Sequence, residues 1–141
     1  MREEKRVPLV VVGVDGSDVS ETVLRWARNQ AKATGGRLRV VFGWHVTDQS
    51  RDVPLRIEAD LDRAAESRVA ELVAAAAPDV PTELVVQEAA PVDLLLREAK
   101  GADLLVLGSV GHGGTGSQPR GTVVRTCLDR APCPVVVVPV G

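Results

Sequence analysis

The sequence predicts a single α/β domain built on a parallel sheet. Short runs rich in valine and leucine alternate with stretches in which apolar residues recur at helical spacing, the pattern of successive βα units. Since 45% of residues are hydrophobic but only 2% aromatic, the core must consist of Val, Leu and Ala, as in buried parallel strands and their covering helices. We find no repeat, low-complexity tract or linker in the 141 residues, so we expect one domain over residues 1–141, with charged residues 1–6 as an N-terminal extension.

In the first half of the chain, turn and cap residues separate the expected elements. Asp15-Gly16-Ser17 is a turn-forming cluster, and Asp18 with Glu21 three residues later is typical of a helix start. The expected elements are a strand over residues 7–14, a helix from Asp18 to Gly35-Gly36, a strand over residues 38–44, a polar loop over residues 45–54 and a long helix ending before Pro78.

The apolar face of that long helix is carried by a stripe with helical spacing. Its members are Leu61, Ala65, Val69, Leu72 and Ala76. We interpret the charged residues opposite this stripe as a solvated face, because no pair among them suggests chemistry.

In the second half, proline and glycine mark the boundaries. Pro91 fits the first turn of a helix, Gly101 is the expected cap at its end, and Pro132 stops the last helix. The expected elements are a strand over residues 82–86, a helix from Pro91 to Gly101, a strand over residues 104–107, a helix marked by Val123, Val124, Cys127 and Leu128, and a strand over residues 135–138.

Charge and composition exclude several classes of protein. The formal net charge is −2 with acids and bases interspersed, so we expect no nucleic-acid partner. The charged first residues do not resemble a signal peptide, and no apolar run approaches the roughly 20 residues of a membrane span. We therefore expect a cytoplasmic protein. Its two cysteines, Cys127 and Cys133, have the spacing neither of a redox pair nor of zinc ligands, so we expect both to be reduced thiols.

Two loops at carboxyl ends of the expected strands can face one crevice, where ligands of open parallel sheets bind. One is Asp15-Gly16-Ser17, and the other is the glycine-rich segment from Gly108 to Thr122. Backbone N–H groups of such a segment can approach an anion closely, and Gly121-Thr122 at a helix start adds unpaired amides. These features favour a phosphate site, although composition alone equally fits a flexible surface loop.

Two common nucleotide motifs nearly fit this segment. Residues 111–116 have G-x-G-x-x-G spacing, but they follow the fourth strand and no acidic residue stands about 20 positions later to hold a ribose. Residues 116–122 resemble a P-loop until the position that needs lysine, where Thr122 follows Gly121 directly. Neither a Rossmann dinucleotide site nor P-loop phosphoryl transfer is therefore expected.

The spacing Gly108-x-x-Gly111, nine residues, Gly121-Thr122 resembles the nucleotide motif of the universal stress protein family. The opening strand with its Asp15-Gly16-Ser17 turn and the closing segment Arg130-Ala131-Pro132-Cys133-Pro134 are similar to that family as well. The resemblance implies an open five-stranded parallel sheet of order 3-2-1-4-5, Rossmann-like and similar to the adenine nucleotide alpha hydrolases. It also implies a role in the stress response, with ATP, either alone or together with Mg²⁺, as the expected ligand.

The resemblance also implies roles for individual residues. Asp15 and the backbone at Gly43 would meet the adenosine part, and Gly108 and Gly111 would lie beside ribose and phosphate. Gly121, Thr122 and Val123 would offer amides and one hydroxyl to the phosphates. For Asp15 the alternative is a structural role, because an Asp before Gly-Ser commonly binds turn amides.

The glycine-rich segment departs from the family pattern at three places. Val110 stands where a basic residue is frequent, Val124 where a second hydroxyl is frequent, and residues 117–120 replace a leucine-rich turn. Arg120 either offsets these losses by reaching the phosphates or is a solvent-facing charge. The sequence therefore predicts where the site lies but leaves open whether it binds a nucleotide.

Catalysis has few candidates in the sequence. His112 lacks an identifiable residue to orient it, His45 is interpreted as a loop residue, and Asp15 with Asp48 makes no recognisable metal cage. We expect a regulatory protein that binds ATP and hydrolyses it slowly at most; the alternatives are a nucleotide-free dimeric interaction protein and, less favoured, a small enzyme. The apolar run from Pro134 to Val140 predicts an edge strand that pairs in a homodimer, as the resemblance also implies.

Overall fold

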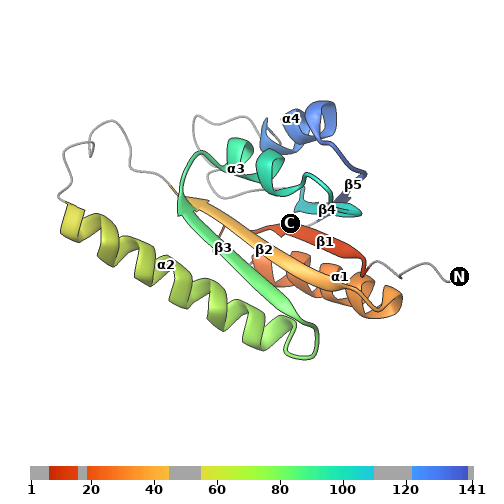
Figure 1. The fold of residues 1–141 in the computed structure, drawn as a ribbon, viewed down its shortest axis with the longest axis horizontal. Coiled ribbons are helices and arrows are strands. Elements are labelled where there is room, and N and C mark those ends of the chain that lie inside the picture. Colours follow the sequence, from red (N-terminus) through yellow and green to blue (C-terminus); the bar gives the residue numbers. More distant parts are fainter. Residues whose placement is uncertain (1–6, 16–18, 45–54, 110–121, 140–141) are drawn as a thin grey trace, which may run out of the picture.

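The computed structural model describes residues 7–15, 19–44, 55–109 and 122–139. Strands and helices alternate along these ranges (Figure 1). In chain order they are β1 (Leu9–Gly13), α1 (Val19–Thr34), β2 (Arg37–Trp44), α2 (Leu55–Ala76), β3 (Thr82–Glu88), α3 (Pro91–Glu98), β4 (Leu104–Gly108), α4 (Thr122–Arg130) and β5 (Val135–Val138).

The strands form one five-stranded parallel sheet of order β3-β2-β1-β4-β5, as the sequence predicts. β1 lies at its centre, where Val12 is level with Val40 of β2 and with Val106 of β4. From β1 the chain winds outward through β2 to β3, then returns to place β4 on the other side of β1. The winding direction therefore reverses between β1 and β4.

Alternate strand residues point to opposite faces of the sheet, so each face has its own core. Val10 and Val12 pack with α1 and α2 in the first cluster, whereas Leu9 and Val11 pack with α3 and α4 in the second. Figure 1 shows α1 and α2 on one side of the sheet and α3 and α4 on the other. Valine, leucine and alanine dominate both clusters, as the composition predicts.

Several element boundaries differ from the sequence prediction. β1 covers Leu9–Gly13 rather than residues 7–14, since Val7 lies beyond the sheet and is 51% exposed. β3 continues to Glu88 because β2 still pairs with it there, and β4 extends to Gly108, which pairs with Val138.

Two helix predictions also need correction. α3 ends at Glu98, with Ala99 as its C-cap, so Gly101, which has a φ of +79°, lies beyond the helix rather than capping it. In α4, Leu128 is 55% exposed although the sequence suggests an apolar face that includes it. The neighbouring Cys127 is fully buried and supplies the contact with the core.

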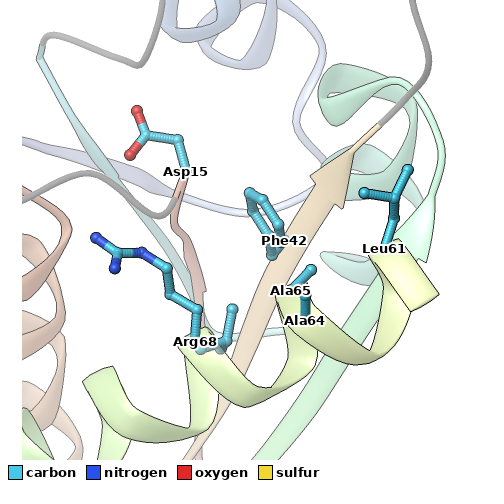
Figure 2. A pocket seen from close by; sticks show the side chains of 7 residues that line it. Asp15, Phe42, Leu61, Ala64, Ala65 and Arg68 are labelled. Carbon is cyan, nitrogen blue, oxygen red and sulfur yellow. The ribbon is translucent and has the colours of Figure 1, made fainter. Parts of the chain in front are cut away.

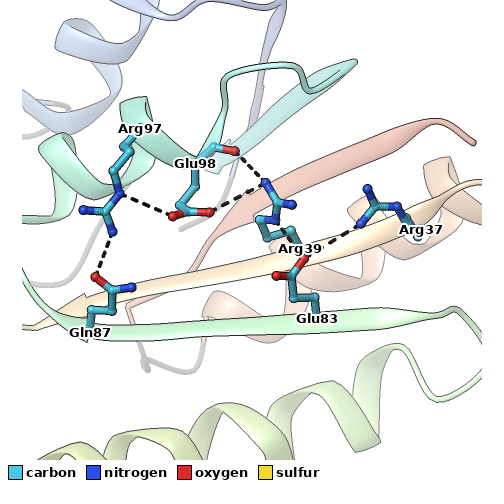
Figure 3. A network of polar contacts seen from close by, with 6 residues as sticks. All are labelled: Arg37, Arg39, Glu83, Gln87, Arg97 and Glu98. Carbon is cyan, nitrogen blue, oxygen red and sulfur yellow. Dashed lines mark hydrogen bonds and ion pairs between the residues drawn. The ribbon is translucent and has the colours of Figure 1, made fainter.

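Charged residues on the β2 and β3 surface that faces α3 are joined in a polar network (Figure 3). Arg39 Nε lies 2.9 Å from Glu83 Oε1 on β3, and Arg39 Nη1 donates a hydrogen bond of 3.1 Å to the backbone carbonyl of Glu98 on α3. The Glu98 carboxylate lies 3.6 Å from the same nitrogen. This network ties α3 to the strands that α3 only partly covers.

Candidate functional site

The candidate site lies at the carboxyl ends of β1 and β4, where the winding direction of the sheet reverses. Ligands of open α/β sheets bind at this kind of switch point. β1 leads into Asp15, and β4 leads into Gly108 and Ser109. The strand order implied by the family resemblance is confirmed, and it makes β1 and β4 direct neighbours.

Asp15 is held in place by the first turn of α1. The Ser20 hydroxyl donates a hydrogen bond of 2.9 Å to Asp15 Oδ1, and the Asp15 backbone N–H donates one of 3.1 Å to Ser20 Oγ. Ser20 is only 3% exposed, so this hydroxyl is a buried support for the carboxylate. Asp15 thus has a structural partner, although its carboxylate still lines a cleft.

That cleft has a volume of about 320 Å³ and lies between the end of the sheet and α2 (Figure 2). Asp15 and Phe42 contribute from the ends of β1 and β2, and α2 contributes the rest. The complete lining is Asp15, Phe42, Leu61, Ala64, Ala65, Arg68 and Val69. A mainly apolar cleft with a few polar groups is the usual composition of a small-molecule site.

Arg68 is the charged lining residue that the sequence analysis missed, along with the apolar Phe42 and Ala64. The interpretation of the α2 charges as a solvated face agrees with the exposure of Arg68, but it overlooks that the same side chain borders the cleft. The signal was present in the sequence, since Arg68 follows Leu61 by seven residues and Ala64 by four, which places the three on one face of a helix.

Gly43 lies near the end of β2, as predicted, and its lack of a side chain has a packing reason. A Cβ there would lie 2.9 Å from the Ala89 carbonyl oxygen, 3.2 Å from Pro91 Cα and 3.3 Å from Leu94 Cδ2. The segment that leads from β3 into α3 therefore passes directly against the Gly43 backbone. Contact between this backbone and a ligand remains an expectation.

The predicted phosphate-binding residues are only partly described. Gly108 ends β4 opposite Val138, and the following Ser109 N–H donates a hydrogen bond of 2.9 Å to the Val138 carbonyl. Val123 packs against the second core cluster in the first turn of α4, which begins at Thr122. Several positions named in the sequence analysis lie outside the described residues: Gly16, Ser17, Asp18, His45, Asp48, Val110, Gly111, His112, Ser117, Arg120, Gly121 and Val140.

The two cysteines are free thiols on the α4 side of the sheet. Burial raises the pKa of the Cys127 thiol, and the neighbouring Cys133 raises it further. Burial also raises the pKa of Cys133, with Asp103 adding to the effect. Both groups are therefore protonated at neutral pH, as expected of structural cysteines.

Two classes of feature are not found in the part of the chain that the structure describes. Among residues 7–15, 19–44, 55–109 and 122–139, no group of three or more His, Cys, Asp or Glu side chains is arranged to hold a metal ion. None of the helices in these ranges combines the length and apolar character needed to span a bilayer.

Comparison with known proteins identifies the family that shares this sequence and architecture. The model of the universal stress protein family matches residues 9–139. A universal stress protein of Mycobacterium tuberculosis is 35% identical over 136 residues, an alignment that covers 91% of this chain and 44% of the relative. The chain thus spans less than half the length of this curated relative.

Solved structures agree with the family model. A universal stress protein from Lactobacillus plantarum superposes with a TM-score of 0.67 at 24% identity, over 96% of this chain and 99% of that one. A universal stress protein solved in complex with cAMP is 33% identical, with a TM-score of 0.60 over 93% of this chain and 95% of that one.

Proposed function

This chain belongs to the universal stress protein family, and on that premise we propose that it is a regulatory protein that binds an adenine nucleotide, with ATP as the expected ligand. The observation that carries the proposal is the cleft bordered by Asp15 beside the switch point between β1 and β4. The 33% identical universal stress protein in complex with cAMP supports an adenine nucleotide as the class of ligand.

The adenosine part belongs in the cleft. A volume of about 320 Å³ is at the lower end of the range for ligand pockets, which suits part of a nucleotide. Phe42, Ala64 and Ala65 offer apolar surface for the base, and the Asp15 carboxylate, braced by Ser20, offers an acceptor for a hydroxyl or amino group. The backbone at Gly43 contributes to the same part of the site.

The phosphates extend from Asp15 toward the end of β4 and the start of α4. Gly108 ends β4 without a side chain, and Thr122 and Val123 present amides at the α4 N-terminus. By the family resemblance, Gly111 and Gly121 are expected to contribute to the same phosphate site. Mg²⁺ would bind through the phosphates themselves, and Asp15 is the carboxylate among the described residues that line the cleft. We expect binding with slow hydrolysis at most, because the donors named above provide phosphate contacts and none of them acts as a general base.

Nucleotide copurification and thermal stabilisation test this function. Native mass spectrometry of freshly purified protein should show an adenine nucleotide, and saturating ATP with Mg²⁺ should raise the melting temperature. Ligand at 100 times Kd adds about 2.7 kcal/mol to the free energy of unfolding. Gly121→Val should abolish the shift, whereas Gly101→Ala, at the opposite end of β4, should lower the melting temperature itself but retain the shift.

A nucleotide-free interaction protein of the same fold is the second candidate. One observation favours it: Val124, where the family frequently has a hydroxyl, packs against the second core cluster. If no nucleotide copurifies and millimolar ATP with Mg²⁺ leaves the melting temperature unchanged, this candidate replaces the first.

Both candidates include a cytoplasmic homodimer formed through the last strand. β5 pairs with β4 along one side, and Val135, Val136 and Val137 are half-buried in the single chain. Edge strands of this composition are normally paired or covered. A second copy of the chain, related by a two-fold axis, would pair with β5 in antiparallel orientation.

A further inference from the structure

Arg68 is the one charged residue in an otherwise apolar set of described cleft-lining residues on α2. Leu61, Ala64 and Ala65 precede it at helical spacing, and all four line the cleft. Leu61, although 43% exposed, borders the cleft at its far end. A guanidinium in this set places a permanent positive charge beside the cleft.

The charged groups of the lining lie at one end of the cleft. Figure 2 shows the Asp15 carboxylate and the Arg68 guanidinium on the same side of Phe42, with Leu61 on the opposite side. Asp15 follows β1, and β1 is the direct neighbour of β4. The charged end of the cleft therefore points toward the carboxyl end of β4, and the apolar end points toward β3.

This polarity matches the two ends of a nucleotide. A base fits the apolar end beside Phe42, while phosphates emerging at the charged end would meet Arg68 before reaching Gly108. Asp15 is an anion at the same end of the cleft, and one of its carboxylate oxygens accepts the Ser20 hydroxyl, so it suits a hydroxyl or amino donor of the ligand rather than a phosphate. Guanidinium groups bind phosphate oxygens in paired, charge-assisted hydrogen bonds.

We propose that Arg68 is a specificity-determining residue that binds the phosphate nearest the ribose, so that the cleft takes an adenine nucleotide in preference to the nucleoside. The inference rests on the proposed function and deepens it. Arg68 would also supply, from α2, a positive charge like that of the basic residue that is frequent in the family where this sequence has Val110.

The test compares adenosine, AMP and ATP by isothermal titration calorimetry. Arg68→Gln should weaken the binding of AMP and ATP about 10-fold or more and change that of adenosine by less than twofold. Arg68→Lys should recover part of the affinity for AMP. Arg63→Gln is the matched control, because Arg63 lies on α2, contacts Asp60 and does not line the cleft, so all three affinities should be unchanged.

The outcomes separate the two proposals. If the wild type binds neither AMP nor ATP, the proposed function fails and this inference falls with it. If the wild type binds AMP and Arg68→Gln binds it equally well, only the inference is overturned. An equal loss for adenosine and AMP also overturns it, since Arg68 would then act on the base or on the shape of the cleft. The urea midpoint of each variant shows that its fold is retained.

Discussion

Asp15 and Ser20 form a reciprocal pair in which the serine hydroxyl donates to the Asp15 carboxylate and accepts from the Asp15 backbone N–H, at 2.9 and 3.1 Å. The pair joins the end of β1 to the first turn of α1 beside the cleft. In the sequence analysis a structural role for Asp15 through turn amides is the alternative to adenosine binding; turn residues 16–18 lie outside the described residues, and the described partner is a buried hydroxyl. The same carboxylate lines the cleft, where we propose that it meets the ligand.

Ser20→Ala should lower the free energy of unfolding by about 1–2 kcal/mol, because two hydrogen bonds of a nearly buried hydroxyl are lost. Urea unfolding followed by circular dichroism measures the change. Thr22→Ala is the control: Thr22 is exposed in the same helix and should change stability by no more than about 0.5 kcal/mol. Equal effects of the two substitutions would contradict the structural role of the pair.

Gly43→Ala should destabilise the protein by about 1–3 kcal/mol through overpacking, since the new methyl group would press on the backbone of Ala89 and Pro91. Gly35→Ala provides a comparison with a different cause: Gly35 has open space around it but a φ of +69°. Its cost of about 1–2 kcal/mol comes from the backbone conformation. A crystal structure of Gly43→Ala should show the β3–α3 connection displaced, and an undisturbed connection would refute the close-packing account.

The free energy of unfolding should depend on pH in the acidic range because of Asp79. The Arg28 guanidinium, with a smaller effect from the Lys32 ammonium, holds the pKa of this carboxyl well below its usual value. The unfolded chain binds a proton on the Asp79 carboxyl more tightly than the folded protein does. The ion pairs of Asp79 therefore add to the free energy of unfolding above the ordinary Asp pKa of about 4, and this contribution is lost as the pH falls below it.

The wild type should therefore exceed Asp79→Asn in urea midpoint at pH 7, with a difference that begins to shrink below about pH 5. Glu66→Gln, at an exposed carboxylate on α2, controls for a general change in charge. A difference for Asp79→Asn that stays constant from pH 7 to pH 3 would rule out the ion pairs as its cause.

The raised pKa values of Cys127 and Cys133 predict slow alkylation of the folded protein. At pH 7.5 the thiols should react with iodoacetamide at least about 10-fold more slowly than in the urea-unfolded chain, because little thiolate is present and Cys127 is fully buried. Mass spectrometry of digests at successive times resolves the two sites. Cys133, which is only partly buried, should react before Cys127, and the reverse order would contradict the structure.

Val137→Pro tests the proposed dimer with little effect on the monomer. The Pro134 and Val138 carbonyls accept hydrogen bonds from Leu105 of β4 and from Ser109 directly after it, so the backbone of Val137 points away from β4. Proline there removes an outward N–H, as is tolerated on edge strands. Light scattering at micromolar concentration should show a dimer for the wild type and for Val137→Ala, but a monomer for Val137→Pro; a monomeric wild type would end the proposal.

The order and type of the elements could be predicted from the sequence because these properties depend on local patterns. The strand at Val135–Val138 has the predicted bounds, and Gly35-Gly36 ends α1, with Gly36 N–H donating to the Ala31 carbonyl. Boundaries shifted where pairing with a neighbour decided them, as at Glu88 opposite Trp44. The lateral strand order came from the family resemblance, since periodicity does not state which strands become neighbours.

The sequence by itself determined a parallel α/β domain and located the candidate site at the loops after β1 and β4. Tertiary structure decided which side chains share that site. Ser20 beneath Asp15, Arg68 beside the cleft and the Ala89 backbone against Gly43 all depend on how helices pack on the sheet. Hydrophobic spacing specifies which face of an element is buried, but the contacts across that face are set only when separate elements meet, as when Leu9 N–H donates to the Asp103 carboxylate 94 residues away.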